Sequence, residues 1–231
     1  MSKPKLDVPW IDYETLRQRA DEFRRRFDVT EVVCPIERIA EFGLGLDIIP
    51  VPDLHTNRDI SGYLTADRSA IMVDAYCCDH REGTFRYTLA HELAHLELHA
   101  DLWERLRFEN AAEWRDAIAS VLTDEQYSAI EWQANAFAGL VLVPGSLLCS
   151  LFEEEVPSIV ETAAQYRGSQ PQTCFDVCLQ VICERMARRF VVHPLTVGVR
   201  CDYDGLSDEF AVRLLGPPHG LVTRGRLHER G

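Results

Sequence analysis

The chain has 231 residues, in which 37 Asp and Glu outnumber 24 Lys and Arg to give a formal net charge of −13. Hydrophobic residues make up 46% of the chain and charged residues 26%, values that exclude an intrinsically disordered protein and a collagen-like fibre. The acidic balance also disfavours a protein that coats nucleic acid, because phosphates repel such a chain unless its basic residues are segregated.

Two observations indicate the compartment. Residues 1–10 contain no apolar stretch that could form the core of a signal peptide. The longest apolar run, residues 138–143, is far shorter than the ~18 residues that a membrane-spanning helix needs. We therefore expect a cytoplasmic protein without membrane contact, whose eight cysteines are reduced thiols rather than disulfides.

The first part of the chain predicts helices followed by short strands. Apolar residues at helical spacing favour an amphipathic helix over residues 12–28, and a short helix should begin at Pro35 and stop near Gly43 or Gly45. Three β-type runs separated by turn-rich stretches then predict a small antiparallel β-meander, and they occupy residues 46–51, 60–65 and 70–74.

The rest of the chain predicts mainly helices. A helix over residues 84–99 precedes an acidic, helix-prone stretch at 100–122. A capping box beginning at Thr123 opens another helix, which Pro144 ends. Further helices are expected at 175–190 and 194–200, followed by an irregular tail broken by Gly and Pro. The order predicts an α+β fold with a domain at residues 1–150 and a helical segment at 151–231.

One motif indicates a catalytic metal site, the HExxH sequence His91-Glu92-Leu93-Ala94-His95. At 100° per residue the two histidines lie one turn and about 40° apart, so both imidazoles project from one helix face. Two imidazoles so placed can bind one Zn²⁺, and Glu92 beside them is positioned to act as a general base. The sequence therefore predicts a zinc-dependent hydrolase.

A catalytic zinc site needs a third protein ligand besides a water. A third histidine in the pattern HExxHxxGxxH is absent, so we expect a carboxylate from another helix. The best candidate is Glu131, with Asn135 one turn later placed to hydrogen-bond the far nitrogen of a ligand histidine. From spacing alone other acidic residues stay open as ligands, namely Glu97, Glu104, Glu109 and Glu113.

Two further residues are weaker candidates for the site. His99, one turn after His95, is expected to be a cation at the helix end or a group that supports a ligand histidine. Tyr63 is a candidate hydrogen-bond donor to an oxyanion, although a tyrosine in a short strand more often serves packing.

Two separated segments, YTLAHELAHLELH at residues 87–99 and EWQANAFAGLVLVP at 131–144, resemble the ImmA/IrrE family of zinc metallopeptidases. The resemblance covers roughly residues 10–145 and implies a zincin-type active-site helix with the meander packed on it. It also implies that Glu131 joins His91 and His95 as the third zinc ligand, with Mn²⁺ as an alternative metal. Beyond this region, residues 186–200 resemble the helix-turn-helix-like segment that often follows in the family.

The resemblance implies a substrate as well. Members of this kind cut a helix-turn-helix transcriptional repressor or antitoxin, which releases a stress-response, mobile-element or toxin–antitoxin operon. Here Glu92 would take a proton from the attacking water and return it to the leaving amine. The sequence departs from the family pattern in Ala94, where glycine is common, and in a long separation between the motifs, so residues 100–122 are expected to be an insertion near the cleft.

Two other interpretations stay open. In the first, the chain is a non-proteolytic regulatory protein with a structural zinc site that binds a repressor or DNA, although the charge of −13 makes direct DNA binding unfavourable. Its candidate contacts are C-terminal arginines: Arg188, Arg189, Arg200, Arg213, Arg224, Arg226 and Arg230. In the second, the peptidase is latent and held shut by the acidic insertion.

Overall fold

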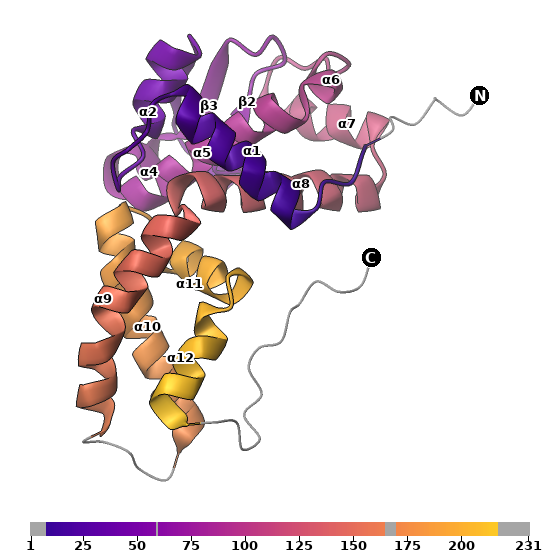
Figure 1. Ribbon diagram of the computed structural model, residues 1–231. Coiled ribbons are helices and arrows are strands. Elements are labelled where there is room, and N and C mark those ends of the chain that lie inside the picture. Colours follow the sequence, from indigo (N-terminus) through magenta and orange to yellow (C-terminus); the bar gives the residue numbers. More distant parts are fainter. Residues whose placement is uncertain (1–7, 59, 165–169, 217–231) are drawn as a thin grey trace. The chain divides into compact units, whose positions relative to one another are not determined.

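A computed structural model describes residues 8–58, 60–164 and 170–216 (Figure 1). The chain forms two compact units, Met1–Leu142 and Val143–Gly231. The first unit combines helices with a three-stranded sheet and the second contains helices, so the predicted α+β fold with a helical C-terminal region is confirmed. The boundary predicted at residue 150 falls inside a helix, α9 (Gly145–Ala164).

The first unit contains the elements that build the candidate site. They are α1 (Tyr13–Arg26), α2 (Ile36–Arg38), the π-helix η1 (Ile39–Gly43), β1 (Asp47–Val51), α3 (Leu54–Arg58), β2 (Gly62–Leu64), β3 (Ala70–Asp74), α4 (Ala75–His80), α5 (Glu82–Leu98), α6 (Ala100–Trp103), α7 (Ala111–Val121) and α8 (Asp124–Leu142). The predicted helices and strands of this region are present. α3 and α4 are not predicted from the sequence, because they are too short for a periodic apolar pattern.

Local hydrogen bonds explain where the long helices begin. The side chain of Asp12 accepts a hydrogen bond from the backbone N–H of Thr15 at 2.9 Å and caps α1. The predicted capping box at the start of α8 is present, because Thr123 Oγ1 accepts from the N–H of Gln126 and Gln126 Oε1 accepts from the N–H of Thr123. Both helices therefore start where the sequence predicts.

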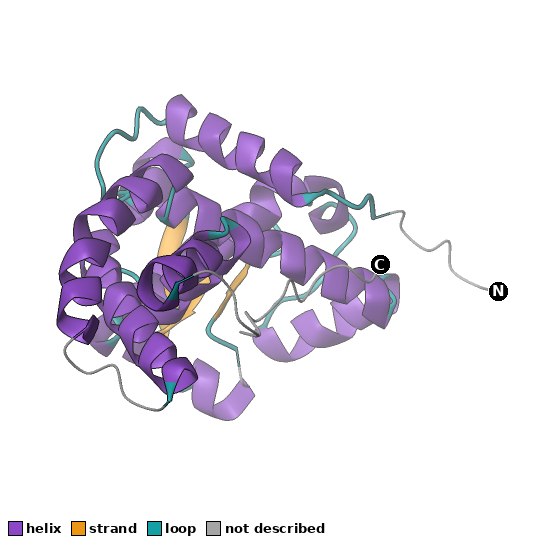
Figure 2. Ribbon diagram, turned by 60° about the horizontal axis from the view of Figure 1, so that its bottom comes forward, coloured by secondary structure: helices purple, strands orange, loops and turns teal. Residues whose placement is uncertain are grey.

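The sheet, drawn in orange in Figure 2, has the strand order β1-β3-β2. β2 pairs with β3 in antiparallel orientation as expected, but β1 runs parallel to β3, with Asp47 opposite Ala70. The prediction of an antiparallel meander is therefore wrong for β1. Between β1 and β2 the chain passes through α3, and β3 then inserts between the two earlier strands. The sequence of a short strand does not indicate whether it pairs in parallel, through a crossover connection, or in antiparallel orientation, through a hairpin.

α5 is the central helix of the first unit, because it contacts β2 and β3 of the sheet and also α8, which in turn packs on α1. Leu89 and Leu93 of its predicted apolar stripe are fully buried, whereas Phe85 and Leu96 are half-buried. Glu92 and His95 are buried as well. The helix therefore carries Glu92 and His95 into the interior of the first unit together with its apolar stripe.

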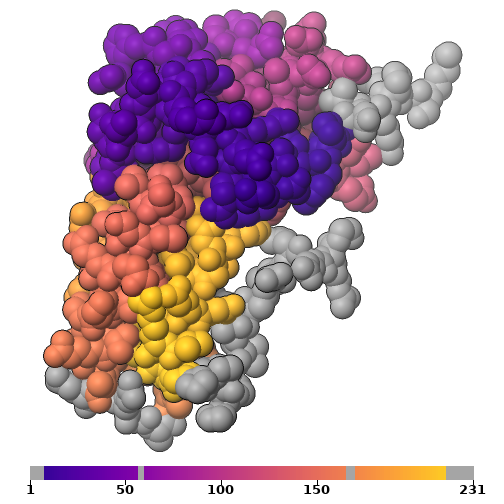
Figure 3. Space-filling view, in the orientation of Figure 1, coloured from indigo at the N-terminus to yellow at the C-terminus, as the bar shows by residue number. Residues whose placement is uncertain are grey.

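Two contacts fix the elements around α5. A Cβ atom at Gly62 would lie 2.5 Å from Cγ2 of Thr88 and 2.9 Å from the carbonyl oxygen of Met72, so only glycine lets β2 approach the helix this closely. The buried guanidinium of Arg24 donates to the carbonyl oxygens of Val141 and Glu31 at 2.9 and 3.0 Å, which ties α1 to the end of α8. The opposite face of α1 lies on the surface (Figure 3, indigo).

The second unit consists of helices, α9 (Gly145–Ala164), α10 (Pro171–Phe190), α11 (Pro194–Tyr203) and α12 (Leu206–Leu215). They pack around an aromatic core that includes Phe152, Phe190 and Phe210. The helices predicted at 175–190 and 194–200 are confirmed, but the predicted irregular tail is wrong for residues 206–215, which form α12. Residues 217–231 of that tail lie outside the described residues.

None of the eight cysteines forms a disulfide, as the sequence predicts for reduced thiols. Among the described residues, no single helix has both the length and the apolar composition needed to cross a membrane. Only α8 and α9 taken together, as a pair bent by 61°, have that length and composition.

Candidate metal centre

The side chains of the HExxH motif meet those of α8 in the interior of the first unit. His91 and His95 project from α5 and Glu131 from α8, and one ligand atom from each lies within 4.8 Å of the others. The two Nε2 atoms are 3.1 Å apart, and the carboxylate oxygens of Glu131 lie 3.3 Å from Nε2 of His91 and 3.4 Å from Nε2 of His95. Three potential ligands thus converge on one point.

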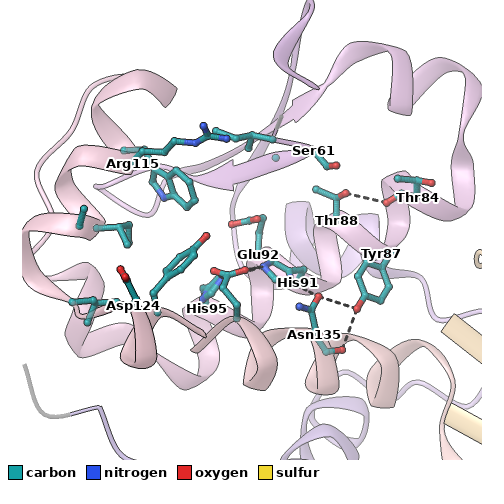
Figure 4. Close-up of a pocket in the computed structure, with 18 of the residues that line it drawn as sticks. Ser61, Thr84, Tyr87, Thr88, His91, Glu92, His95, Arg115, Asp124 and Asn135 are labelled. Atoms are coloured by element: carbon teal, nitrogen blue, oxygen red, sulfur yellow. Dashed lines mark hydrogen bonds and ion pairs between the residues drawn. The ribbon is translucent and has the colours of Figure 1, made fainter. Parts of the chain in front are cut away.

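The hydrogen bonds of His91 fix which nitrogen faces the cluster. Oδ1 of Asn135 lies 3.1 Å from Nδ1 of His91, and the hydroxyl of Tyr87 donates to the same oxygen at 3.0 Å (Figure 4). Because an amide oxygen only accepts, Nδ1 of His91 carries the proton. The lone pair of Nε2 therefore points at the cluster, in the tautomer that a metal ligand requires.

A longer chain of hydrogen bonds fixes which ring nitrogen of His95 carries the proton. The amide nitrogen of Gln133 donates to the carbonyl oxygen of Pro9 at 3.2 Å, so Oε1 of Gln133 accepts from Nε2–H of His99 at 2.9 Å. Nδ1 of His99 is then an acceptor, and Nδ1–H of His95 donates to it at 3.1 Å. Nε2 of His95 is left as a lone pair facing the cluster.

The state of His99 agrees with this chain. Burial lowers the pKa of His99 to about 4, so its imidazole is neutral at physiological pH and can accept and donate at once. The structure therefore shows His99 as a buried, neutral partner of His95 and Gln133 rather than as a cation at the helix end.

The donor set fits a divalent cation. Burial opposes the ionisation of Glu131, but hydrogen bonds from His91 and His95, when their Nε2 atoms carry protons, outweigh this and lower its pKa, so the side chain is a carboxylate. Two imidazole lone pairs and a carboxylate that face one another repel unless a proton or a cation lies between them. Two His nitrogens and one Glu oxygen are a set that catalytic zinc sites use.

Glu92 lies beside this cluster without belonging to it. Its side chain is buried, and Oε2 accepts a hydrogen bond from the backbone N–H of Leu64 in β2 at 2.8 Å. Burial raises the pKa of Glu92, although His91 and His95 partly offset the effect. A carboxylate with a raised pKa next to a metal position has the properties of a general base and acid.

A cavity of about 610 Å³ opens in front of the cluster. The cluster itself forms part of the lining. The rest comes from residues 60–62, which lead into β2, from α5, from α7 and its C-cap, and from α8. Figure 4 shows His91, Glu92 and His95 between Thr88 and Tyr87 on one side and Asp124 on the other. The potential metal position is therefore open to a substrate.

Tyr127 also lines this cavity, and the sequence analysis missed it. It lies one turn before Glu131 on α8, and this i−4 spacing is the signal that could have found it. Burial raises the pKa of Tyr127 to about 12, and the carboxylates of Glu131 and Glu92 contribute. The hydroxyl therefore stays protonated and can donate a hydrogen bond.

The structure contradicts the role predicted for Tyr63. This side chain is 5% exposed, packs edge-on against Phe108 with ring centroids 6.2 Å apart, and does not line the cavity. Packing therefore explains it. The other acidic candidates also lie elsewhere: Glu97 pairs with Arg26, and Glu113 binds the N-terminal cap of α7 through Asn110.

The comparison with known families agrees with this geometry. The family Peptidase_M78, described as the IrrE N-terminal-like domain, matches residues 57–187, which is more than half of the chain. The chain belongs to this family. The Peptidase_M78 match spans both motif helices, α5 and α8, and supports a metallopeptidase-like function for the first unit. No curated protein matches the chain.

The support of His95 in this Peptidase_M78 domain can be tested with Gln133→Leu. The substitution keeps the size of a fully buried side chain but removes the acceptor for His99. We expect zinc affinity to fall by about 10- to 100-fold, because the supporting hydrogen bonds fix the ligand tautomer. Competition with a chromophoric chelator measures the dissociation constant.

Gln18→Leu, on the exposed face of α1, is the matched control and should leave the zinc affinity unchanged. An unchanged zinc affinity in a folded Gln133→Leu protein would contradict the assignment of the hydrogen-bond chain.

Proposed function

We propose that the protein is a zinc-dependent endopeptidase that cuts a helix-turn-helix transcriptional repressor or an antitoxin. The observation that carries the proposal is a cluster of three potential ligands, His91, His95 and Glu131, whose open side faces a cavity and has Glu92 beside it. The nature of the substrate protein rests on the resemblance of the two motif segments to the ImmA/IrrE family.

The bound metal and the residues around the cluster have separate roles in hydrolysis. Zinc bound there supplies Lewis acidity toward water and the substrate carbonyl. Glu92 takes the proton from the attacking water and passes it to the leaving amine. The N–H of Leu64 holds one oxygen of Glu92, so the carboxylate keeps its orientation while the other oxygen is left for the water.

The register of β2 indicates how a substrate backbone binds. Ser61 and Thr65 pair with β3, through the bonds from Asp74 N to Ser61 O and from Thr65 N to Ala70 O, so the backbone groups of residues 62 and 64 face the other way. Those of Leu64 already bind Glu92 and the indole of Trp103. The N–H and C=O of Gly62, at the cavity, are thus the pair that an extended peptide would meet.

A structural zinc site is a weaker alternative. Structural sites are closed by four protein ligands, whereas the cluster found among the described residues has three and borders a cavity. The arginines of the binding alternative are also largely engaged in the second unit. Arg200 is buried and pairs with Asp204, Arg189 pairs with Glu154, and Arg213 pairs with Glu153.

Four candidates for this alternative remain. Arg188 is exposed, and the tail arginines Arg224, Arg226 and Arg230 lie outside the described residues. Closure by the segment 100–122, the latent form of the peptidase, is disfavoured because α7 leaves the cavity open beside the cluster.

We assign Tyr127 as the hydrogen-bond donor to the carbonyl oxygen of the substrate. Its hydroxyl makes no hydrogen bond with another described residue, although it lines the same cavity as Glu92 and Glu131. A protonated phenol at this place can donate to the carbonyl oxygen as negative charge develops there. Tyr87, the other tyrosine at the cavity, is already bound to Asn135.

Glu92→Gln tests the proposed chemistry. We expect the variant to bind zinc with the affinity of the wild type and to lose cleavage by at least ~10²-fold, because a general base and acid contributes about 10²- to 10⁴-fold. The zinc-loaded proteins are incubated with the repressor encoded beside this chain, and mass spectrometry detects the fragments. Glu97→Gln, the same change five residues further along α5 and outside the cavity lining, should cut normally.

A Glu92→Gln protein that still cuts the repressor would remove Glu92 from the mechanism. A wild-type protein that binds zinc but leaves the repressor intact would contradict the proposed substrate, and failure to cut any peptide would contradict the peptidase itself.

Tyr127→Phe tests the assigned hydrogen-bond donor. Loss of the hydroxyl should lower kcat by about 10²- to 10³-fold with little change in KM, because the donor acts on charge that develops only in the transition state. Steady-state kinetics on a fluorogenic peptide measure both constants. Tyr76→Phe, at an exposed position on α4, is the control; equal loss in both variants would refute the assignment.

A further inference from the structure

We propose that α7 is the specificity wall of the cavity and that it selects substrates with a bulky apolar side chain next to the scissile bond. The proposal rests on the proposed peptidase function and deepens it. It also gives a role to the acidic segment 100–122, which the sequence analysis set apart as an insertion near the cleft.

The wall is built by one face of α7. Trp114, Ile118 and Leu122 follow one another at intervals of four residues, so their side chains lie on the same side of the helix and its C-cap, and all three line the cavity. Ile118 is 5% exposed and Leu122 9%, whereas Trp114 is half-buried. The side chains that α7 presents to the cavity through this face are therefore largely apolar, and the one polar atom among them is Nε1 of Trp114, a buried donor without a hydrogen-bond partner among the described residues.

The opposite side of the cavity supports the same conclusion. The buried Ile60, just before β2, and the ring of Tyr127 add apolar surface. The charged residues Arg115 and Asp124 also line the cavity, but both are exposed and therefore lie at its solvent side (Figure 4). An apolar interior with a charged rim is the usual form of a pocket that binds an apolar group from a polar chain.

The size of the cavity sets what it can take. About 610 Å³ lies in the middle of the ~300–1,000 Å³ range of small-ligand pockets, which is more than the metal-bound part of a substrate needs. The apolar side chains of Ile118 and Leu122 in the cavity lining favour a leucine, methionine or phenylalanine side chain over alanine or a charged residue. A single methylene group in such a pocket changes the specificity constant by about 10- to 200-fold.

Ala119 offers a way to fill the pocket without disturbing the core. It lines the cavity from α7 but is exposed, so a larger side chain can be accommodated by the fold. Ala112, also exposed and on α7 but not among the cavity-lining residues, provides the same substitution outside the pocket. Ala119→Phe and Ala112→Phe are thus a matched pair.

The experiment measures cleavage and binding separately. The zinc-loaded wild type and both variants are given a peptide library, and mass spectrometry identifies the residues that flank each cut. Calorimetry then measures the binding of two peptide hydroxamates that differ in one side chain, benzyl or methyl, next to the metal-binding group.

For the wild type we expect a preference of at least 10-fold for large apolar residues at one position beside the cut, and a similar preference for the benzyl hydroxamate. Ala119→Phe should lose this preference, whereas Ala112→Phe should behave like the wild type.

Cleavage without side-chain preference, or a preference that Ala119→Phe leaves unchanged, would overturn the assignment of the wall. Selective binding of the benzyl hydroxamate without any cleavage would instead support the wall and contradict the proposed peptidase function. The two failures are therefore distinguishable.

Discussion

The convergence of two imidazole lone pairs and a carboxylate between α5 and α8 is the constraint on which the first unit depends. Nε2 atoms 3.1 Å apart, with carboxylate oxygens 3.3 and 3.4 Å away, are unfavourable neighbours in a partly buried place unless positive charge lies among them. The fold maintains this arrangement because α5 and α8 pack against each other along their length. A cluster of three potential metal ligands is thus held in place by the packing of these two helices.

Residues from distant parts of the sequence support the arrangement. Pro9 and Gln133 orient His99, which orients His95, and Tyr87 with Asn135 orients His91. On the other side of α5, the glycine at position 62 brings β2 close enough for its backbone to hold Glu92. These contacts explain why the N-terminal segment, the sheet and α8 are all needed to shape one site.

The sequence predicted the parts of the site that local patterns specify. The HExxH spacing predicted that His91 and His95 share a helix face with Glu92 beside them, because helical periodicity determines which side chains share a face. Spacing alone left Glu131 as one of several acidic candidates, and the resemblance of its segment to the ImmA/IrrE family singled it out. The sequence could not determine that Gln133 supports His99, since that contact depends on how two helices and the N-terminal segment pack. The parallel pairing of β1 and the burial of Tyr63 against Phe108 are likewise results of tertiary packing.

The most direct test of the central claim is anomalous X-ray diffraction at the zinc edge from crystals of the metal-loaded protein. The account predicts a single zinc peak per chain, about 2.0–2.1 Å from Nε2 of His91 and of His95 and ~2.0–2.2 Å from a carboxylate oxygen of Glu131, with one position open to the cavity. A zinc ion without Glu131 among its ligands, or one enclosed by four protein ligands, would contradict it.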